Sequence, residues 1–251
     1  MQAYGPGFAR VYDLKWAGFA HKVAPRLLHF HRSQGGDPAR DRVLDLCCGT
    51  GLIARHFLDQ GYRVTGLDLS APMLEHARSL AGEHVRAGRA TFVQADASDF
   101  ALDERFGLAV STYDALNHLA DIDALRRCFA CVGRVCDGWF VFDLNTRAGL
   151  RRWNSIEVDE SRPDAVVISR GGYDGHGDRA WMQASGFVEV RDGLYERFSE
   201  TVYNTAFEME KVRQALLETG WREAWFSTID GFPHPVADPE AEGRVFVVAR
   251  K

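Results

Sequence analysis

A glycine-rich turn between a short apolar strand and a helix limits the folds that are open to this chain. The strand runs through Val43-Leu44-Asp45-Leu46, and the turn that follows is Cys47-Cys48-Gly49-Thr50-Gly51. Glycine allows a sharp turn and lets a ligand approach the backbone without a Cβ in the way. The helix that follows offers unpaired N–H groups at the same point. Because dinucleotide-binding folds share this glycine pattern, it does not decide the ligand by itself.

The first half of the chain alternates between expected strands and expected helices. The strands cover residues 42–47, 62–68, 90–94, 106–112 and 139–145, and the helices cover residues 8–31, 51–60, 72–81 and 122–136. Strands separated by helices imply right-handed crossovers and a mostly parallel sheet.

After Asn145 the pattern changes. Residues 166–172, 180–190 and 195–204 alternate in polarity, are rich in aromatic and β-branched residues, and are joined by turns with Gly and Asp. This pattern predicts an antiparallel meander. A helix over residues 208–219 and strands over 221–229 and 244–249 complete the expected elements.

Acidic residues end the first three expected strands, where ligands bind in open α/β sheets. Asp45 would repel a pyrophosphate and would suit a cationic group such as an ammonium. Asp68, which follows Gly51 by 17 residues, can accept hydrogen bonds from both hydroxyls of a ribose. Asp96 can accept from an adenine amino group, with the N–H of Ala97 facing the ring. Each acid also has a structural interpretation, as a turn cap, a helix-dipole partner or a solvated loop acid.

In these residues the chain resembles the class I S-adenosylmethionine-dependent methyltransferases. The matching stretches are residues 45–51, residues 68–70 with Met73, and residues 94–97, and the resemblance covers about residues 40–145. It implies S-adenosylmethionine as the cofactor. It also implies an α/β fold with a Rossmann-like seven-stranded methyltransferase sheet and a reversed last strand, plus an antiparallel β insertion.

The resemblance implies roles for the matching residues as well. The glycine turn would hold the methionyl part, Asp68 the ribose, and Asp96 with Ala97 the adenine. In similar enzymes a tyrosine at the position of Tyr12 reaches the methionyl carboxylate; here that side chain could instead only pack on an amphipathic helix. The residues that we expect to bind the cofactor are Tyr12, Asp45, Cys47, Gly49, Gly51, Asp68, Leu69, Met73, Asp96, Ala97, Thr112 and Asn117.

The segment of residues 111–119 follows the fourth strand and is similar to that of members acting on amino sugars and other small metabolites. The N-P-P-Y type of motif, found in members that methylate nucleobase or protein amides, is absent. His118 is the expected catalytic base, because imidazole titrates near neutral pH. The alternative is that His118 only positions a ligand or bonds the backbone. The other histidines form no ligand cluster, so no metal is expected.

The composition and charge of the chain limit the kinds of molecule that we expect it to bind. The formal net charge is -5 and the Arg residues are spread among acids, so no nucleic-acid partner is expected. No stretch approaches the ~20 apolar residues that cross a bilayer. We expect all five cysteines to be free thiols, with Cys128, Cys131 and Cys136 packed in the core. Free thiols are typical of a reducing compartment, so we expect a cytoplasmic protein.

We expect a single domain over residues 1–251, with an N-terminal helical lid over 1–36 and the β insertion over 160–205. The aromatic residues of the insertion could line a pocket for a small-molecule methyl acceptor, pair across strands, or form a homodimer surface. Two other functions stay open. An NAD(P)-dependent oxidoreductase would explain the glycine turn and Asp68 but not Asp45 and Asp96. A cofactor-binding module without catalysis would keep the same site.

Overall fold

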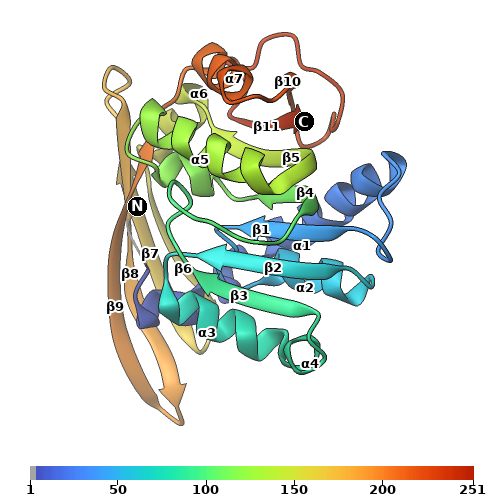
Figure 1. Cartoon of the computed structure of the whole chain (residues 1–251). Helices are drawn as coiled ribbons and strands as arrows, with labels where there is room; N and C mark the ends of the chain where they lie inside the picture. Colours follow the sequence, from blue (N-terminus) through green and yellow to red (C-terminus); the bar gives the residue numbers. More distant parts are fainter. Residues whose placement is uncertain (1–3) are drawn as a thin grey trace.

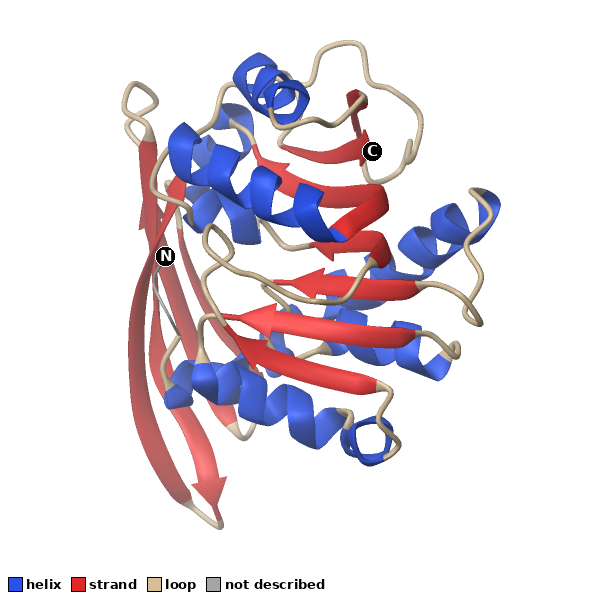
Figure 2. Cartoon of the chain, viewed as in Figure 1, coloured by secondary structure: helices blue, strands red, loops and turns tan. Residues whose placement is uncertain are grey.

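The computed structural model describes residues 4–251 and contains two sheets (Figures 1 and 2). The larger sheet has seven strands in the order β10-β11-β5-β4-β1-β2-β3. Its strands are β1 (Arg42–Leu46), β2 (Arg63–Asp68), β3 (Ala90–Gln94), β4 (Phe106–Ser111), β5 (Cys136–Asn145), β10 (Glu223–Ser227) and β11 (Arg244–Arg250). The first five are parallel, whereas β11 runs antiparallel to both β5 and β10. The predicted sheet with a reversed last strand is confirmed.

Helices cover both faces of this sheet. They are α1 (Pro6–Ser33), α2 (Leu52–Asp59), α3 (Ala71–Leu80), α4 (Gly82–Arg86), α5 (Ile122–Val135), α6 (Arg147–Leu150) and α7 (Met209–Glu218), with 3-10 turns at Ala115–His118 and Arg151–Trp153. Side-chain N-caps fix the starts of three helices in the described chain: Ser70 accepts from the Met73 N–H at 3.3 Å, Asp121 from the Ala124 N–H at 2.8 Å, and Thr146 from the Gly149 N–H at 3.2 Å.

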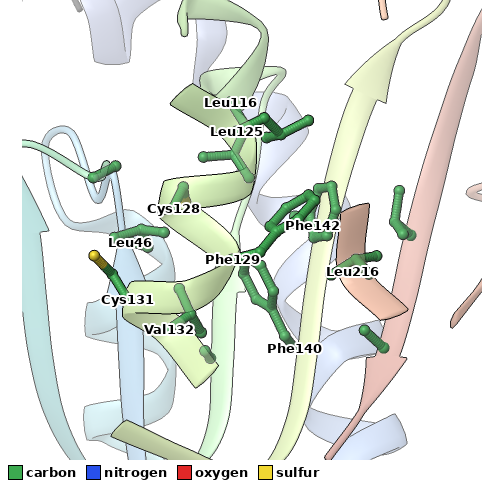
Figure 3. Packing of buried hydrophobic residues seen from close by; sticks show 14 of the residues in the cluster. Leu46, Leu116, Leu125, Cys128, Phe129, Cys131, Val132, Phe140, Phe142 and Leu216 are labelled. Carbon is green, nitrogen blue, oxygen red and sulfur yellow. The ribbon is translucent and has the colours of Figure 1, made fainter. Parts of the chain in front are cut away.

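Alternate residues of the central strands supply the cores of the two faces. On one face, Phe129 of α5 packs with Phe140 and Phe142 of β5 and with Leu216 of α7 (Figure 3). On the other face, Val141, which lies between these two phenylalanines, packs in the cluster that α1, α2 and α3 cover. Both faces of β5 are therefore buried, as expected for an inner strand of a parallel sheet.

The second sheet is the predicted β insertion, with four antiparallel strands in the order β6-β7-β8-β9. They are β6 (Ile156–Arg162), β7 (Ala165–Gly172), β8 (Arg179–Arg191) and β9 (Leu194–Thr205). The arrows of β1 and β2 point toward this sheet (Figure 1), so it stands across the carboxyl ends of the parallel strands. The sequence pattern did not predict β6, because its carboxylates make the alternation of apolar and polar residues hard to recognise. Glu157 and Asp159 face α1 and pair with Lys15 at 3.1 and 3.8 Å.

Helix α1 connects the two sheets. Its first half packs on the inner face of the insertion sheet, where Phe8 and Val11 share a buried cluster with Val167 and Phe198. Its second half, including Leu27, packs in the core of the larger sheet. The helix therefore runs over the space between the two sheets. Within residues 4–251, none of the helices combines the length and the apolar character needed to cross a membrane.

Candidate functional site

The glycine turn folds as the sequence requires. Cys47, Gly49 and Gly51 all have left-handed backbone angles, with φ of 57°, 53° and 83°. At Gly51 a Cβ would lie 2.9 Å from the Ala77 Cβ, so glycine lets the start of α2 approach α3 closely. At Gly49 no atom lies within 4 Å of where a Cβ would stand. The turn therefore leaves open space above its backbone, which is what a ligand needs.

Two of the three strand-end acids are bonded to the turn region. The Asp68 carboxylate accepts from the Gly49 N–H at 2.9 Å and from the Ser70 N–H at 2.8 Å. Asp45 accepts from the Ala54 N–H at 2.9 Å and is only 2% exposed. Burial raises the pKa of Asp45 to about 7, against the lowering effect of this bond. Burial also raises the pKa of Asp68, although its backbone hydrogen bonds oppose the shift. Asp45 thus caps a helix and still lines the cavity beside the turn.

Two adjoining small cavities lie along the turn, and most of the predicted cofactor residues line them. Tyr12 of α1 borders both cavities, whereas Met73 of α3 and His118 border only one of them. The predicted residues found on these walls are Tyr12, Asp45, Cys47, Gly49, Asp68, Met73 and Thr112. Four segments that are far apart in the sequence are brought together here.

Four other predicted residues do not line these two cavities. Gly51 lies behind the turn as the N-cap of α2, and Leu69 is partly exposed just after β2. Asp96, in the loop after β3, accepts from the N–H and the hydroxyl of Ser98, both at 2.7 Å, and these bonds hold its pKa low against the effect of burial. Ala97 is 1% exposed and packs in the core.

Asn117 lies away from the cavities, in contrast to the sequence expectation. Its Oδ1 accepts from the Asn145 N–H at 2.9 Å, and its Nδ2 donates to the carbonyls of Asn145 at 3.1 Å and Thr205 at 2.8 Å. The side chain is fully buried, and backbone groups use both ends of its amide. Asn117 therefore ties the loop after β4 to β5 and β9 instead of reaching toward a ligand.

His118 lies between the two sheets. Its Nδ1 is 3.1 Å from the Tyr203 carbonyl oxygen of β9, and its Nε2 is 3.1 Å from the Tyr4 hydroxyl. Because a carbonyl oxygen only accepts, we assign the proton to Nδ1, which leaves the lone pair of Nε2 facing Tyr4. Burial lowers the pKa of His118, opposed by the nearby Asp114 and by the bond to Tyr203. The imidazole is therefore neutral at pH 7 and can accept a proton at Nε2.

A larger cavity of about 270 Å³ lies between α1, the loop after β4 and the inner face of the insertion sheet. Phe8, Tyr12 and Trp16 line it from α1 at four-residue spacing, which places them on one face of the helix. Met182 of β8 and Val202 of β9 line the opposite wall. Tyr4, Tyr12 and His118 border both this cavity and the one beside the turn.

A buried charge cluster forms part of the cavity floor, and sequence reasoning missed it. Tyr113 and Asp114 are consecutive non-glycine residues with φ of 67° and 48°, and their N–H groups donate to Asp143 at 2.6 and 2.9 Å. Arg244 pairs with Asp114 at 2.6 Å and also with Asp143. Asn204 donates to Asp114 at 2.7 Å. No local signal could reveal the cluster, because its members come from β5, β9, β11 and the loop after β4.

The strand order, the reversed β11 and the glycine turn between acids define the class. The chain is a class I S-adenosylmethionine-dependent methyltransferase. Within residues 4–251 there is no group of three or more His, Cys, Asp or Glu side chains placed to hold a metal ion.

Comparisons with known proteins agree with this class. Residues 43–137 match the model of a family described as a methyltransferase domain. The putative methyltransferase YqeM of Bacillus subtilis is 26% identical over 228 residues, which cover 86% of this chain and 85% of that protein. The dTDP-3-amino-3,6-dideoxy-alpha-D-glucopyranose N,N-dimethyltransferase of Streptomyces fradiae is 34% identical over 133 residues, covering 51% of this chain and 49% of that protein. A solved S-adenosylmethionine-dependent methyltransferase from Clostridium acetobutylicum shares the fold, with a TM-score of 0.79, 22% identity and 97% coverage of both chains.

Proposed function

We propose that this enzyme methylates a nitrogen or oxygen atom of a small-molecule metabolite. The observation that carries the proposal is the cavity of about 270 Å³ that lies between the two sheets next to His118. Its volume is just below the range of small-molecule sites. Aromatic and apolar residues make up about half of its walls, and polar or charged residues, among them Arg152, Glu157 and Arg170, make up the rest. The similar Streptomyces fradiae protein is named as an N,N-dimethyltransferase of a dTDP-linked amino sugar, which is a small-molecule acceptor.

We place the cofactor along the glycine turn because the residues there fit its chemistry. S-adenosylmethionine, when bound, supplies a methyl group on a positively charged sulfur. Asp45 would face the ammonium of the methionyl part, and Asp68 would accept from the ribose hydroxyls with the oxygen lone pairs that Gly49 and Ser70 leave free. Asp96 and Ala97 would hold the adenine at the end of β3.

His118 is the proposed base for an acceptor amine or hydroxyl. Its Nε2 lone pair faces the Tyr4 hydroxyl where the cavities adjoin, so a proton can reach it from the acceptor side. The leaving group of methyl transfer is neutral, so no acid is needed to protonate it. The other residues of the site therefore have to align the acceptor atom, the methyl group and the sulfur. We place the enzyme in the cytoplasm, since all five of its cysteines are free.

The test combines calorimetry with an acceptor screen. The wild-type protein should bind S-adenosylmethionine and add 14 mass units to members of a panel of amino sugars, small amines and small phenols. Asp68→Ala should weaken cofactor binding about 100-fold, through the loss of two hydrogen bonds to a charged acceptor at ~1.5 kcal/mol each. The matched control is Asp103→Ala, an exposed acid away from the turn. Methylation of protein or nucleic acid alone, with every small molecule untouched, would refute the proposal.

A further inference from the structure

Asp114 stands at the start of the turn that carries His118, yet its side chain does not cap that turn. It is the N-cap residue of the 3-10 turn Ala115–His118, and its carboxylate makes no hydrogen bond to the backbone there. An aspartate in this position ordinarily accepts from the first free N–H groups of the turn. Asp114 is only 7% exposed, and its oxygens instead accept from Arg244 at 2.6 Å and from Asn204 at 2.7 Å. The carboxylate therefore has a role other than the usual one of its position.

The buried cluster that contains Asp114 has charges that do not cancel. Arg244 is the positive group that pairs with both Asp114 and Asp143. Asp143 also accepts from the N–H groups of Tyr113 and Asp114. When all three groups are ionised, two carboxylates face one guanidinium, and one negative charge is left over. A buried charge is costly unless an opposite charge compensates it, so the cluster favours a positive charge in its surroundings.

The imidazole of His118 is the group next to the cluster that can take up a positive charge. The Tyr4 hydroxyl faces its Nε2, and the Tyr203 carbonyl faces its Nδ1, so neither of these neighbours brings a charge. Burial lowers the pKa of His118, and of the two carboxylates that oppose this shift Asp114 has the larger effect and Asp68 the smaller. Burial and Asp114 also raise the pKa of Tyr4, so its hydroxyl stays protonated and can donate to Nε2.

We propose that Asp114 is a positioning residue for methyl transfer: held by Arg244 and Asn204, it fixes the turn that carries His118 and supplies the counter-charge when the imidazole takes up a proton. The inference rests on the proposed function, in which His118 is the base. In that step an N–H or O–H group of the acceptor loses its proton to Nε2. The electron pair of the acceptor atom forms the bond to the methyl carbon, and the C–S bond breaks with its pair left on sulfur. The carboxylate of Asp114 stabilises the imidazolium that results.

The hydrogen bonds around Asp114 allow its charge to be removed while its shape is kept. Asparagine tolerates the left-handed backbone angles of this position, where φ is 48°. Its Oδ1 can still accept from Arg244. The Oδ1 of Asn204 is buried and has no hydrogen-bond partner among the described residues, so a rotation of that amide would offer it to the new Nδ2. Asp114→Asn therefore tests the charge separately from the packing.

Titration of the His118 imidazole by nuclear magnetic resonance measures the interaction without a methyl acceptor. The signal is assigned by its loss in His118→Asn, and the protein is saturated with S-adenosylhomocysteine. Asp114→Asn should lower the midpoint of the titration by about one pH unit. With the same acceptor at saturation, the acid limb of the kcat profile should move down by the same amount, and the plateau should fall severalfold because a weaker base takes the proton less readily.

Asp121→Asn is the matched control. Asp121 is an exposed acid three residues after His118, and an asparagine caps α5 equally well, so this variant should keep the wild-type profiles. The double variant Asp114→Asn/Asn204→Asp moves the carboxylate to the other side of the same hydrogen bond and should bring the midpoint back toward the wild-type value. If Asp114→Asn does not fold, Asp114→Gly replaces it, since glycine suits the positive φ.

An unchanged His118 midpoint in Asp114→Asn overturns the inference, as does a double variant that keeps the midpoint of the single one. A midpoint that moves while the kcat profile stays would show that His118 is not the base, which also overturns the positioning role. An enzyme that methylates no small molecule refutes the proposed function, and the titration of His118 then decides the charge pairing by itself.

Discussion

Asp45 gives the cofactor site a dependence on pH that can be measured. Its carboxylate is buried at the glycine turn, and burial raises its pKa to about 7. The ammonium of S-adenosylmethionine would favour the ionised form. Binding should therefore release a proton from Asp45 near neutral pH, and the affinity should fall as the solution is acidified.

The size of the effect follows from the pKa. If the bound carboxylate is fully ionised, each pH unit below about 7 weakens binding about tenfold, which gives about 30-fold at pH ~5.5 relative to pH ~8. Asp45→Asn keeps a side chain of the same shape with an oxygen for the Ala54 N–H. This variant should bind more weakly at pH ~8, but with an affinity that no longer changes with pH.

The same substitution should have the opposite effect on stability. Because the folded pKa of Asp45 lies above its unfolded value, the folded state binds the extra proton, and stability is lost as pH rises from about 4 to about 7. A shift of about three units corresponds to about 4 kcal/mol at most. Asp45→Asn should therefore raise the free energy of unfolding at pH ~8 and leave it nearly unchanged at pH ~4.

Titration calorimetry in buffers of different ionisation enthalpy measures both the affinity and the released proton, and urea unfolding measures the stability. Asp103→Asn, which changes an exposed acid, is the control and should alter neither. The reasoning fails if the wild-type affinity is constant between pH ~8 and ~5.5. It also fails if Asp45→Asn keeps the wild-type slope, since another group would then be the one that titrates.

Three further predictions concern other parts of the site. His118→Asn should lower kcat at least 100-fold with little change in cofactor affinity, and wild-type activity should fall as the pH drops below the lowered pKa of His118, as a pH–rate profile would show. Arg244→Leu should destabilise the fold by about 3–5 kcal/mol in urea unfolding, because two buried carboxylates lose their partner; a loss below ~1 kcal/mol would contradict this. Gly51→Ala should lower the free energy of unfolding more than Gly88→Ala does. Both glycines have a positive φ, but only at Gly51 would a Cβ lie 2.9 Å from another side chain, that of Ala77. Equal losses in the two variants would mean that the packing against Ala77 contributes nothing.

The parallel half of the fold could be predicted because its signals are local. Apolar runs, the glycine turn and the cap at Ser70 each lie within a few residues, and parallel strands bring their carboxyl ends to one edge. Asp45 and Asp68 were therefore expected near each other, and both bond to the turn region.

What could not be predicted depends on distant partners. Strand β6 has the sequence of a polar loop, and it could not be recognised as a strand because the partner of its carboxylates, Lys15, lies far away in the sequence. The sequence places Asn117 where an amide could bind a ligand, but it does not show that backbone groups of Asn145 and Thr205 form hydrogen bonds with this amide. The pairing of Arg244 with Asp114 joins residues 130 positions apart, and no pattern in the sequence predicts it.

The two walls of the site are encoded in separate stretches of the chain. The residues beside the glycine turn come from α1 and from the larger sheet and its loops, whereas Met182 and Val202 come from an insertion that leaves the sheet after Asn145 and returns before Met209. A segment joined at two points can be exchanged as a unit. Grafting the corresponding segment from a relative should therefore change the methyl acceptor while the donor stays the same, which offers both a route for natural divergence and a starting point for engineering.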